Sequence, residues 1–159
     1  MNDHQILEQA EARPAARGFV PSLVSIMKSG RALITLRLAE IGLHPGQDHM
    51  LMALPEDGPP VLVSELADTL GVRSSTASKM LDRLEFAGLV RRSNGPSDRR
   101  HTIVHLTPKG NEVRKQVEEL WAEVEFYILR GVSDEEAEAM CQATERLDAL
   151  MSERLRRLR

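Results

Sequence analysis

Cysteine and aromatic residues are nearly missing from this chain of 159 residues. Cys141 is its only cysteine, and aromatic side chains account for 3% of the sequence. A single cysteine excludes a disulfide within the chain and a site built from several thiolates, so we expect a reducing, cytoplasmic setting. With so few aromatics, the core must consist of Leu, Val, Ile, Met and Ala, which suit helix packing better than a sandwich or barrel. A mainly helical fold is predicted.

The sequence also lacks a long hydrophobic run. Its first residues mix charged, small and polar types, and no segment approaches the roughly 18 consecutive apolar residues of a membrane span. We therefore expect neither export nor insertion into a membrane. The overall balance, with 42% hydrophobic and 28% charged residues, is ordinary for one folded globular protein.

Signatures of catalysis and of metal binding are missing as well. No serine or cysteine lies in a recognisable nucleophile motif, and the turn 94–98 has one glycine, too few for a phosphate-binding loop. His101 and His105 fall on one predicted strand, but no His-x-x-x-His pair follows that strand. The sequence therefore predicts a protein that is not an enzyme and that has no metal site and no cofactor.

Apolar residues recur at helical spacing over most of the chain. The pattern predicts helices at about 19–43, 45–54, 63–70, 74–87, 107–130 and 133–158, with two short strands at 89–93 and 99–106. Ser64 is a plausible N-cap, Pro45 fits the first turn of the second helix, and Thr107-Pro108 is a strong helix start. The predicted fold class is all-α with a small two-stranded β wing.

Positive charge is concentrated in one part of the chain, although the net charge is −3. From Arg73 to Arg100, seven cations stand against three anions, whereas acidic residues gather in 112–125 and 134–145. Clustered Lys and Arg side chains supply the affinity of proteins for nucleic-acid phosphates. The basic segment is therefore the candidate site for binding DNA.

The same segment combines a short helix, a tight turn at Gly71, a second helix and a basic hairpin. A helix fits the major groove of DNA, and small hydroxyl side chains at its start allow a close approach to bases and phosphates. An arginine at the tip of a hairpin suits the narrow minor groove. The candidate DNA-binding residues are Ser74, Ser75, Thr76, Ser78, Lys79, Arg83, Asp98, Arg99 and Arg100.

Several motifs in this region resemble the MarR family of bacterial transcription regulators. They are Ser64-Glu65-Leu66-Ala67, Leu70-Gly71-Val72, Ser75-Thr76-Ala77-Ser78, Leu81-Asp82-Arg83-Leu84-Glu85, Gly88-Leu89-Val90-Arg91-Arg92, Asp98-Arg99-Arg100 and Leu106-Thr107-Pro108-Lys109-Gly110. The resemblance implies a winged helix-turn-helix DNA-binding region at 45–107. Residues 1–44 and 108–159 would supply an N-terminal arm and the helices of an obligate homodimer, which reads a palindromic operator in double-stranded DNA.

The resemblance also implies roles for particular side chains. Arg100 would enter the minor groove, and Asp98 would orient the wing. The regulator would be a repressor modulated by a small-molecule effector, commonly a phenolic or aromatic acid in this family, and Arg31, His44 and His49 could contact it.

Other interpretations of these residues remain open. The chain could be a redox-responsive or metal-responsive regulator, or a winged-helix module that binds protein. Cys141 is expected to be a small core residue. Asp82 and Glu85 are expected to pair with Arg83 or its neighbours, while Arg91 and Arg92 could be solvated or could contact DNA.

Overall fold

The computed structural model describes residues 18–56, 58–94 and 102–158. The chain divides after Leu120 into two compact units, and the division falls inside a long helix. The predicted boundaries at 44 and 107 stay a prediction.

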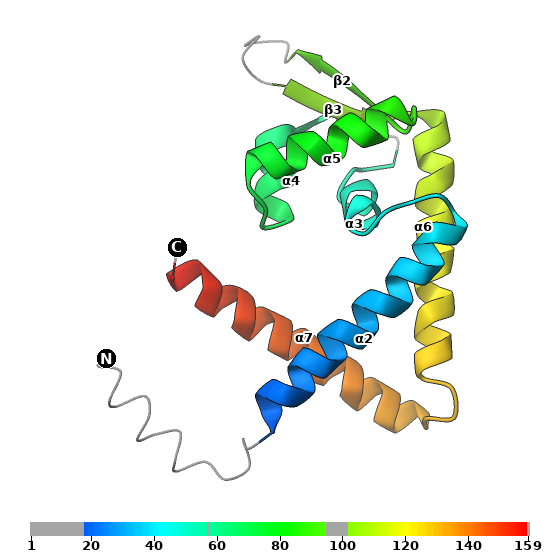
Figure 1. Cartoon of the computed structure of the whole chain (residues 1–159), viewed down its shortest axis with the longest axis vertical. Helices are drawn as coiled ribbons and strands as arrows, with labels where there is room; N and C mark the ends of the chain where they lie inside the picture. Colours follow the sequence, from blue (N-terminus) through cyan, green and yellow to red (C-terminus); the bar gives the residue numbers. More distant parts are fainter. Residues whose placement is uncertain (1–17, 57, 95–101, 159) are drawn as a thin grey trace. The chain divides into compact units, whose positions relative to one another are not determined.

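The first unit contains most of the helices and the sheet. Along the chain come α2 (Phe19–Glu40), α3 (Gln47–Met52), β1 (Val61–Leu62), α4 (Val63–Thr69), α5 (Ser74–Phe86), β2 (Val90–Asn94), β3 (Thr102–Leu106) and the first part of α6 (Pro108–Ile128) (Figure 1). The mainly helical fold class predicted from the sequence is confirmed.

The turn between α4 and α5 depends on Gly71. Its φ of +63° lies in the left-handed region that glycine adopts without steric cost. The amide of Gly71 donates to the carbonyl of Asp68, and the amide of Val72 donates to that of Ala67, which is the Schellman pattern of a helix end. This turn sets the direction of α5 after α4.

The sheet has three antiparallel strands in the order β1-β3-β2, not the two strands that the sequence predicted. β2 and β3 form the expected hairpin, with Val90 opposite Leu106 and Arg92 opposite Val104. The extra strand β1 pairs Val61 with Val104. Because β1 has only two residues and follows a proline-rich break, it carries no alternating pattern by which the sequence could have revealed it.

Two predicted helix starts are also wrong in detail. Ser64 lies inside α4 rather than capping it; the Glu65 carboxylate instead accepts from the amide of Leu62, at 3.2 Å. Pro45 precedes α3, whose N-cap is Gly46. By contrast, the predicted cap at Thr107 is confirmed, because its Oγ1 accepts from the amide of Gly110 at 3.0 Å.

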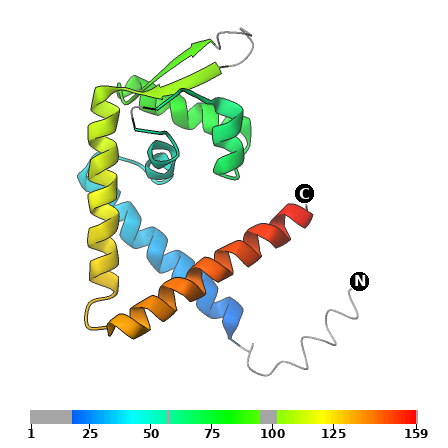
Figure 2. The ribbon, with the colours of Figure 1, turned by 180° about the vertical axis from the view of Figure 1, so that it is seen from behind.

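The core of the first unit gathers aliphatic residues from every one of its helices and from the sheet. Its fully buried members include Leu38, Met50, Leu51, Leu54, Leu66, Ala77, Leu81, Leu84, Val104 and Val117. From behind, α4 and α5 are seen to pack beside the hairpin, and α6 begins where β3 ends (Figure 2). The inner faces of α4 and α5 are thus buried and the outer face of α5 stays open.

The second unit consists of the end of α6, a short turn and α7 (Asp134–Arg157). Ser133 caps α7, with its Oγ accepting from the amide of Glu136 at 3.3 Å. No described residue of α7 is buried. Cys141 is therefore half-buried on a helix surface and is not the core residue that the sequence suggested.

Among the described residues, one helix, α2, passes a test of length and composition for crossing a membrane, which the sequence analysis did not expect. A single such helix is weak evidence, since helices that pack in soluble proteins pass the same test. Its exposed apolar side chains include Phe19, Val20, Val24, Ile26 and Met27.

Candidate nucleic-acid interface

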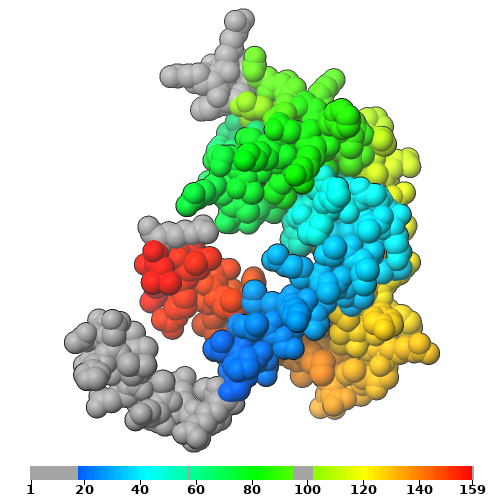
Figure 3. Space-filling model, viewed as in Figure 1, coloured from blue at the N-terminus to red at the C-terminus, as the bar shows by residue number. Residues whose placement is uncertain are grey.

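The outer face of α5 carries the hydroxyl and cationic side chains predicted to contact DNA. Ser74, Ser75, Thr76, Lys79 and Arg83 are exposed, and Ser78 is half-buried. The opposite face is fixed in the core by Ala77, Leu81 and Leu84. The space-filling view shows α5, in green, lying open on this side of the first unit (Figure 3). The structure thus brings the six α5 candidates together on or beside one open surface.

The first turn of α5 adds unpaired backbone donors to this surface. The helix has no side-chain cap and no acidic residue in its first turn. Its first bonded amides are those of Thr76 and Ala77, which both donate to the carbonyl of Arg73. The amides of Ser74 and Ser75 thus remain available at the positive end of the helix, a favourable place for a phosphate.

Arg92 joins helix α5 to strand β2. Its Nε donates to the Glu85 carboxylate at 2.8 Å, and its Nη2 donates to Asp82 at 2.6 Å. The backbone amide of Arg92 also donates to Glu85, at 3.0 Å. The two acids were expected to pair with Arg83 or its neighbours; they do form salt bridges, but their partner is Arg92 and not Arg83. Strand alternation decides the partner, because Arg92 lies on the same face of β2 as the buried Val90.

The charges of this pair support each other. Hydrogen bonds from the backbone and side chain of Arg92 lower the pKa of Glu85, and the hydrogen bond to Glu85 raises the pKa of Arg92. Both acidic side chains of the helix are thereby engaged by one arginine. Four other cations of the described segment 73–94 make no ion pair with a described residue: Arg73, Lys79, Arg83 and Arg91.

The C-terminal end of α5 is held by the start of α6. Thr107 Oγ1 donates to the carbonyl of Gly88 at 2.7 Å, and Lys109 Nζ donates to the carbonyl of Ala87 at 2.9 Å. A Cβ on Gly110 would stand 1.9 Å from the carbonyl oxygen of Leu89, so only glycine fits there. We call Thr107, Lys109 and Gly110 the α5 clamp.

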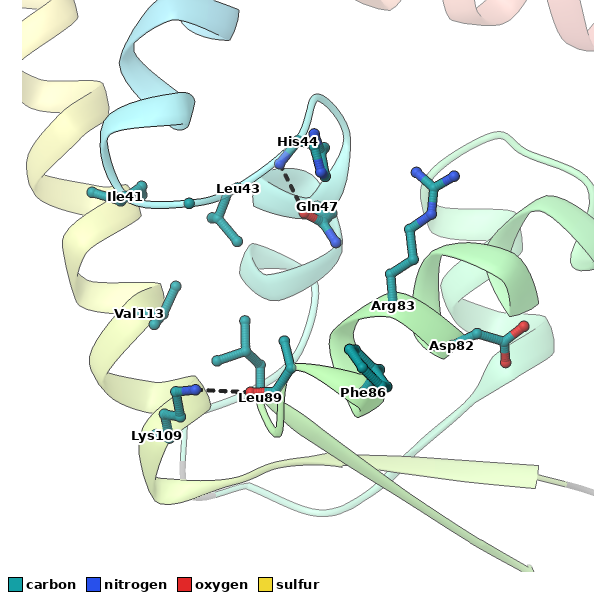
Figure 4. Close-up of a pocket in the computed structure, with 12 residues that line it drawn as sticks. Ile41, Leu43, His44, Gln47, Asp82, Arg83, Phe86, Leu89, Lys109 and Val113 are labelled. Atoms are coloured by element: carbon teal, nitrogen blue, oxygen red, sulfur yellow. Dashed lines mark hydrogen bonds between the residues drawn. The ribbon is translucent and has the colours of Figure 1, made fainter.

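A cavity of about 490 Å³ opens beside the clamp. Leu43, Leu89, Val113 and Phe86 are among its apolar lining, and Phe86 is 96% exposed. The full lining is Ile41, Gly42, Leu43, His44, Gln47, Asp82, Arg83, Phe86, Ala87, Leu89, Lys109 and Val113. In the close-up, Arg83 extends on the side that faces His44 and Gln47, whereas Asp82 points away (Figure 4).

The three predicted effector residues do not share this cavity. His44 lines it, but Arg31, an exposed residue of α2, and His49 do not. His49 instead pairs with the buried Asp48, with Nδ1 at 3.2 Å from Oδ2. Gln47 and Asp48 hold the adjacent loop, since the amide of His44 donates to Gln47 and that of Gly46 donates to Asp48.

The Asp48–His49 pair shifts both pKa values. Burial raises the pKa of Asp48, but the hydrogen bond and charge of His49, with the backbone amides of His49 and Gly46, outweigh burial and lower it overall. The hydrogen bond to Asp48 raises the pKa of His49. Across the described part of the chain, no three His, Cys, Asp or Glu side chains are grouped as metal ligands.

Comparison with known proteins identifies the helix-turn-helix region. The model of the MarR family matches residues 43–102, from the loop before α3 into β3. The chain carries a MarR-family domain. The matched segment contains α4, α5 and β2, and MarR-family proteins are transcription regulators.

Solved structures extend the likeness beyond the MarR-family domain. The crystal structure of MarR shares 26% identity, with a TM-score of 0.73 over 86% of this chain and 91% of that chain. A MarR transcriptional regulator from Methanosarcina mazei has 23% identity and a TM-score of 0.74, covering 85% of this chain and 97% of its own. FabT from Streptococcus pneumoniae, solved in complex with DNA, has 22% identity and a TM-score of 0.72, covering 85% and 97%.

Three candidate residues of the wing, Asp98, Arg99 and Arg100, lie outside the described residues. Sequence reasoning did not single out Arg73, which is exposed directly before the recognition helix. Its place at the N-cap could have indicated a phosphate contact. It also missed the clamp, since a lysine two residues after Thr107 gives no sign in the sequence that it reaches back to Ala87.

Proposed function

We propose that this chain is a sequence-specific transcription regulator that acts in the cytoplasm and binds a palindromic operator as a homodimer. The observation that carries the proposal is the open face of α5, where Ser75, Lys79 and Arg83 stand free while Arg92 holds both acids of the helix. A face with hydroxyls and uncompensated cations suits the major groove and its flanking phosphates.

In this proposal different residues contact the bases, the phosphates and the minor groove. Ser74, Ser75, Thr76 and Ser78 approach base edges and the nearest phosphates at the start of the helix, and Lys79 and Arg83 bind the backbone one helical turn apart. Asp98, Arg99 and Arg100 form the tip of the wing, with Arg100 in the minor groove.

The homodimer is supported by apolar side chains that lie exposed along α7. Met140, Leu150, Met151, Leu155 and Leu158 are at least 42% exposed along α7. The first turn of α7 is acidic, and its last turn carries Arg154, Arg156 and Arg157. Two α7 helices packed antiparallel would bury the apolar stripe and bring opposite charges together, which is the self-complementarity of a two-fold interface.

A small-molecule effector is the second part of the proposal. The cavity beside α5 has an apolar floor and the cationic side chains of Arg83 and Lys109 at its edge. The one acidic residue of its lining, Asp82, is engaged by Arg92. An organic acid with an apolar body fits this combination, and its binding would lower the affinity of a repressor for its operator.

The proposal is tested by measuring binding to duplex DNA selected from a random library and to the DNA upstream of the chain's own gene. We expect a palindromic site with two half-sites about one helical turn apart, bound by two chains. A matched control replaces Lys28, an exposed lysine of α2, with alanine and should bind as the parent does. If the protein selects no sequence from the library and binds all duplexes equally, specific recognition is rejected.

The competing interpretation is a winged-helix module that binds a protein. It predicts that Lys79→Ala and Arg83→Ala leave DNA affinity unchanged across a salt titration. If the chain is a transcription regulator, each variant should bind DNA more weakly, and its DNA affinity should depend less steeply on salt concentration.

A further inference from the structure

The α5 clamp and the cavity share one residue, Lys109. Among the three clamp residues, only Lys109 lines the cavity. Gly110 is buried and Thr107 half-buried at the start of α6, where Thr107 accepts from the amide of Gly110 and donates to Gly88. Ala87 and Leu89, whose carbonyls accept from Lys109 and Thr107, also line the cavity, and Lys109 is the clamp side chain that a molecule there can contact directly.

The existing partner of that ammonium is a neutral group. Lys109 Nζ donates to the carbonyl of Ala87, the C-cap of the recognition helix, at 2.9 Å. The charge also complements the negative end of the helix. An anion adds charge–charge attraction to its hydrogen bond with the ammonium, which the neutral carbonyl of Ala87 does not supply. An anion in the cavity therefore competes with Ala87 for Lys109.

We propose that Lys109 is the positioning residue through which an anion in the cavity weakens the hold on the recognition helix. This inference rests on the proposed function and adds the route of regulation. When the ammonium turns to the anion, the carbonyl of Ala87 loses its side-chain partner, and the side-chain hydrogen bonds that remain in the clamp are those of Thr107 to Gly88 and Leu89. The helix loosens at the end where Arg83 and Phe86 also line the cavity.

Regulation through Lys109 has a thermodynamic consequence that a purely structural role of Lys109 does not have. The anion-free state keeps the clamp closed and binds DNA better, so anion and DNA oppose each other's binding by the same factor. Removing the ammonium leaves α5 in the loosened state whether or not the anion is present. Lys109→Met is therefore expected to lower DNA affinity and to abolish the response to the anion together.

The test uses the full-length protein, the selected operator duplex and 2-naphthoate as the anion, with neutral 2-naphthamide as its control. For the parent we expect 2-naphthoate to weaken DNA binding by about tenfold, within the usual range of allosteric coupling, and 2-naphthamide to have no effect. Lys109→Met should bind DNA several-fold more weakly and show no change with either compound. Lys109→Arg keeps the charge and should restore both properties.

Hydrogen exchange measures the state of the α5 clamp in the protein without DNA. The amides of Gly88 and Leu89 donate to Glu85 and Leu84 at the end of α5, so their hydrogen exchange reports on this end of the helix. In the parent, 2-naphthoate should speed exchange at Gly88 and Leu89, whereas in Lys109→Met exchange should be fast from the start and unaffected. Lys28→Met is the control for loss of a lysine elsewhere in the first unit.

The outcomes separate this inference from the proposed function. If the parent binds its operator but 2-naphthoate changes neither DNA affinity nor hydrogen exchange, regulation through Lys109 is rejected, whereas the proposed function as a DNA-binding regulator is not. If Lys109→Met lowers DNA affinity but keeps the parental response, Lys109 is only structural. If no DNA is bound specifically, the proposed function fails, and the exchange experiment still decides whether an anion opens the clamp.

Discussion

At the scale of single residues, Gly110 shows how strictly the first unit is packed. A Cβ at this position would lie 1.9 Å from the carbonyl oxygen of Leu89, a backbone atom that has no freedom to turn aside. We expect Gly110→Ala to destabilise the protein by about 1–3 kcal/mol or more, because the start of α6 must move away from α5. Urea unfolding measures the change.

The control for this substitution is Gly30→Ala. Gly30 lies within α2, and a Cβ there would meet no atom within 4 Å. Alanine is also the better helix former by about 0.5–1 kcal/mol. The steric explanation is contradicted if the two alanine variants unfold at the same urea concentration.

The pair of His49 and the buried Asp48 gives a second prediction at this scale. The pKa of His49 is raised above 6.5, so its protonated form is favoured in the folded protein. The stabilisation is complete below a pH of 6.5 and is lost as the pH rises through the folded pKa. His49→Gln should therefore lower the free energy of unfolding at about pH 5.5 and have little effect at about pH 8.5.

Urea unfolding of both proteins at the two pH values measures this difference. His44→Gln serves as the control, because His44 is exposed and donates to Gln47 through its backbone only. An equal loss for His49→Gln at both pH values would mean that the imidazole acts by packing rather than by charge.

Arg100 carries the most specific residue prediction that came from the sequence. Arg100→Ala should weaken operator binding by about 1–3 kcal/mol, since the side chain is predicted to act in the minor groove. The thermal midpoint should stay the same. Parental affinity across a salt titration would show that the wing arginine has no such contact.

At the scale of elements, α5 and β2 are coupled through Arg92. Glu85→Gln keeps the size of the side chain but removes the charge that Arg92 binds at 2.7 Å. Because the Glu85 side chain is 36% exposed, we expect a loss of only about 0.5–1 kcal/mol after solvent screening. The pKa of Glu85 is lowered, so this stabilisation is present above a pH of 4.5 and is lost as the pH falls through the folded pKa.

The measurement compares the parent with Glu85→Gln in urea at neutral and acidic pH. The difference should shrink under acidic conditions, where Glu85 itself becomes protonated. Glu65→Gln is the contrasting variant. Glu65 accepts from the backbone amide of Leu62 at the start of α4 and pairs with no arginine among the described residues. A difference that grows on acidification would contradict the assigned pairing.

At the scale of the whole molecule, the exposed apolar stripe of α7 predicts an assembly. Deleting 145–159 removes Leu150, Met151, Leu155 and Leu158 but none of the proposed DNA contacts. We expect the shortened chain to lose the homodimer and with it tight binding to the full palindrome, because one lobe alone contacts one half-site. Analytical ultracentrifugation and fluorescence anisotropy measure the two losses.

The matching control for the deletion is Leu150→Glu with Leu155→Glu in the complete chain. The charged side chains should prevent association while the length of α7 is kept. A folded monomer that still binds the complete palindrome as tightly as the parent would contradict both the interface and the dimeric mechanism.

The elements that local chemistry encodes were predictable from the residues alone. Helical spacing placed α2, α5 and α7, glycine marked the turn at Gly71, and Thr107 announced the start of α6, because each of these signals acts within a few residues of the chain. The basic segment and its motifs also pointed to α5 as the candidate helix for binding DNA. Most of the fold class and the α5 part of the candidate site were predictable for that reason.

Contacts between segments that are distant in sequence became visible only in the folded chain. The partner of Asp82 and Glu85 is Arg92, the strand β1 pairs with β3, and Lys109 reaches Ala87 across 22 positions. His44 lines the cavity while Arg31 and His49 do not. These outcomes depend on how α5, the sheet and α6 pack, and a periodic pattern records which face of a segment is buried but not which side chain it meets there.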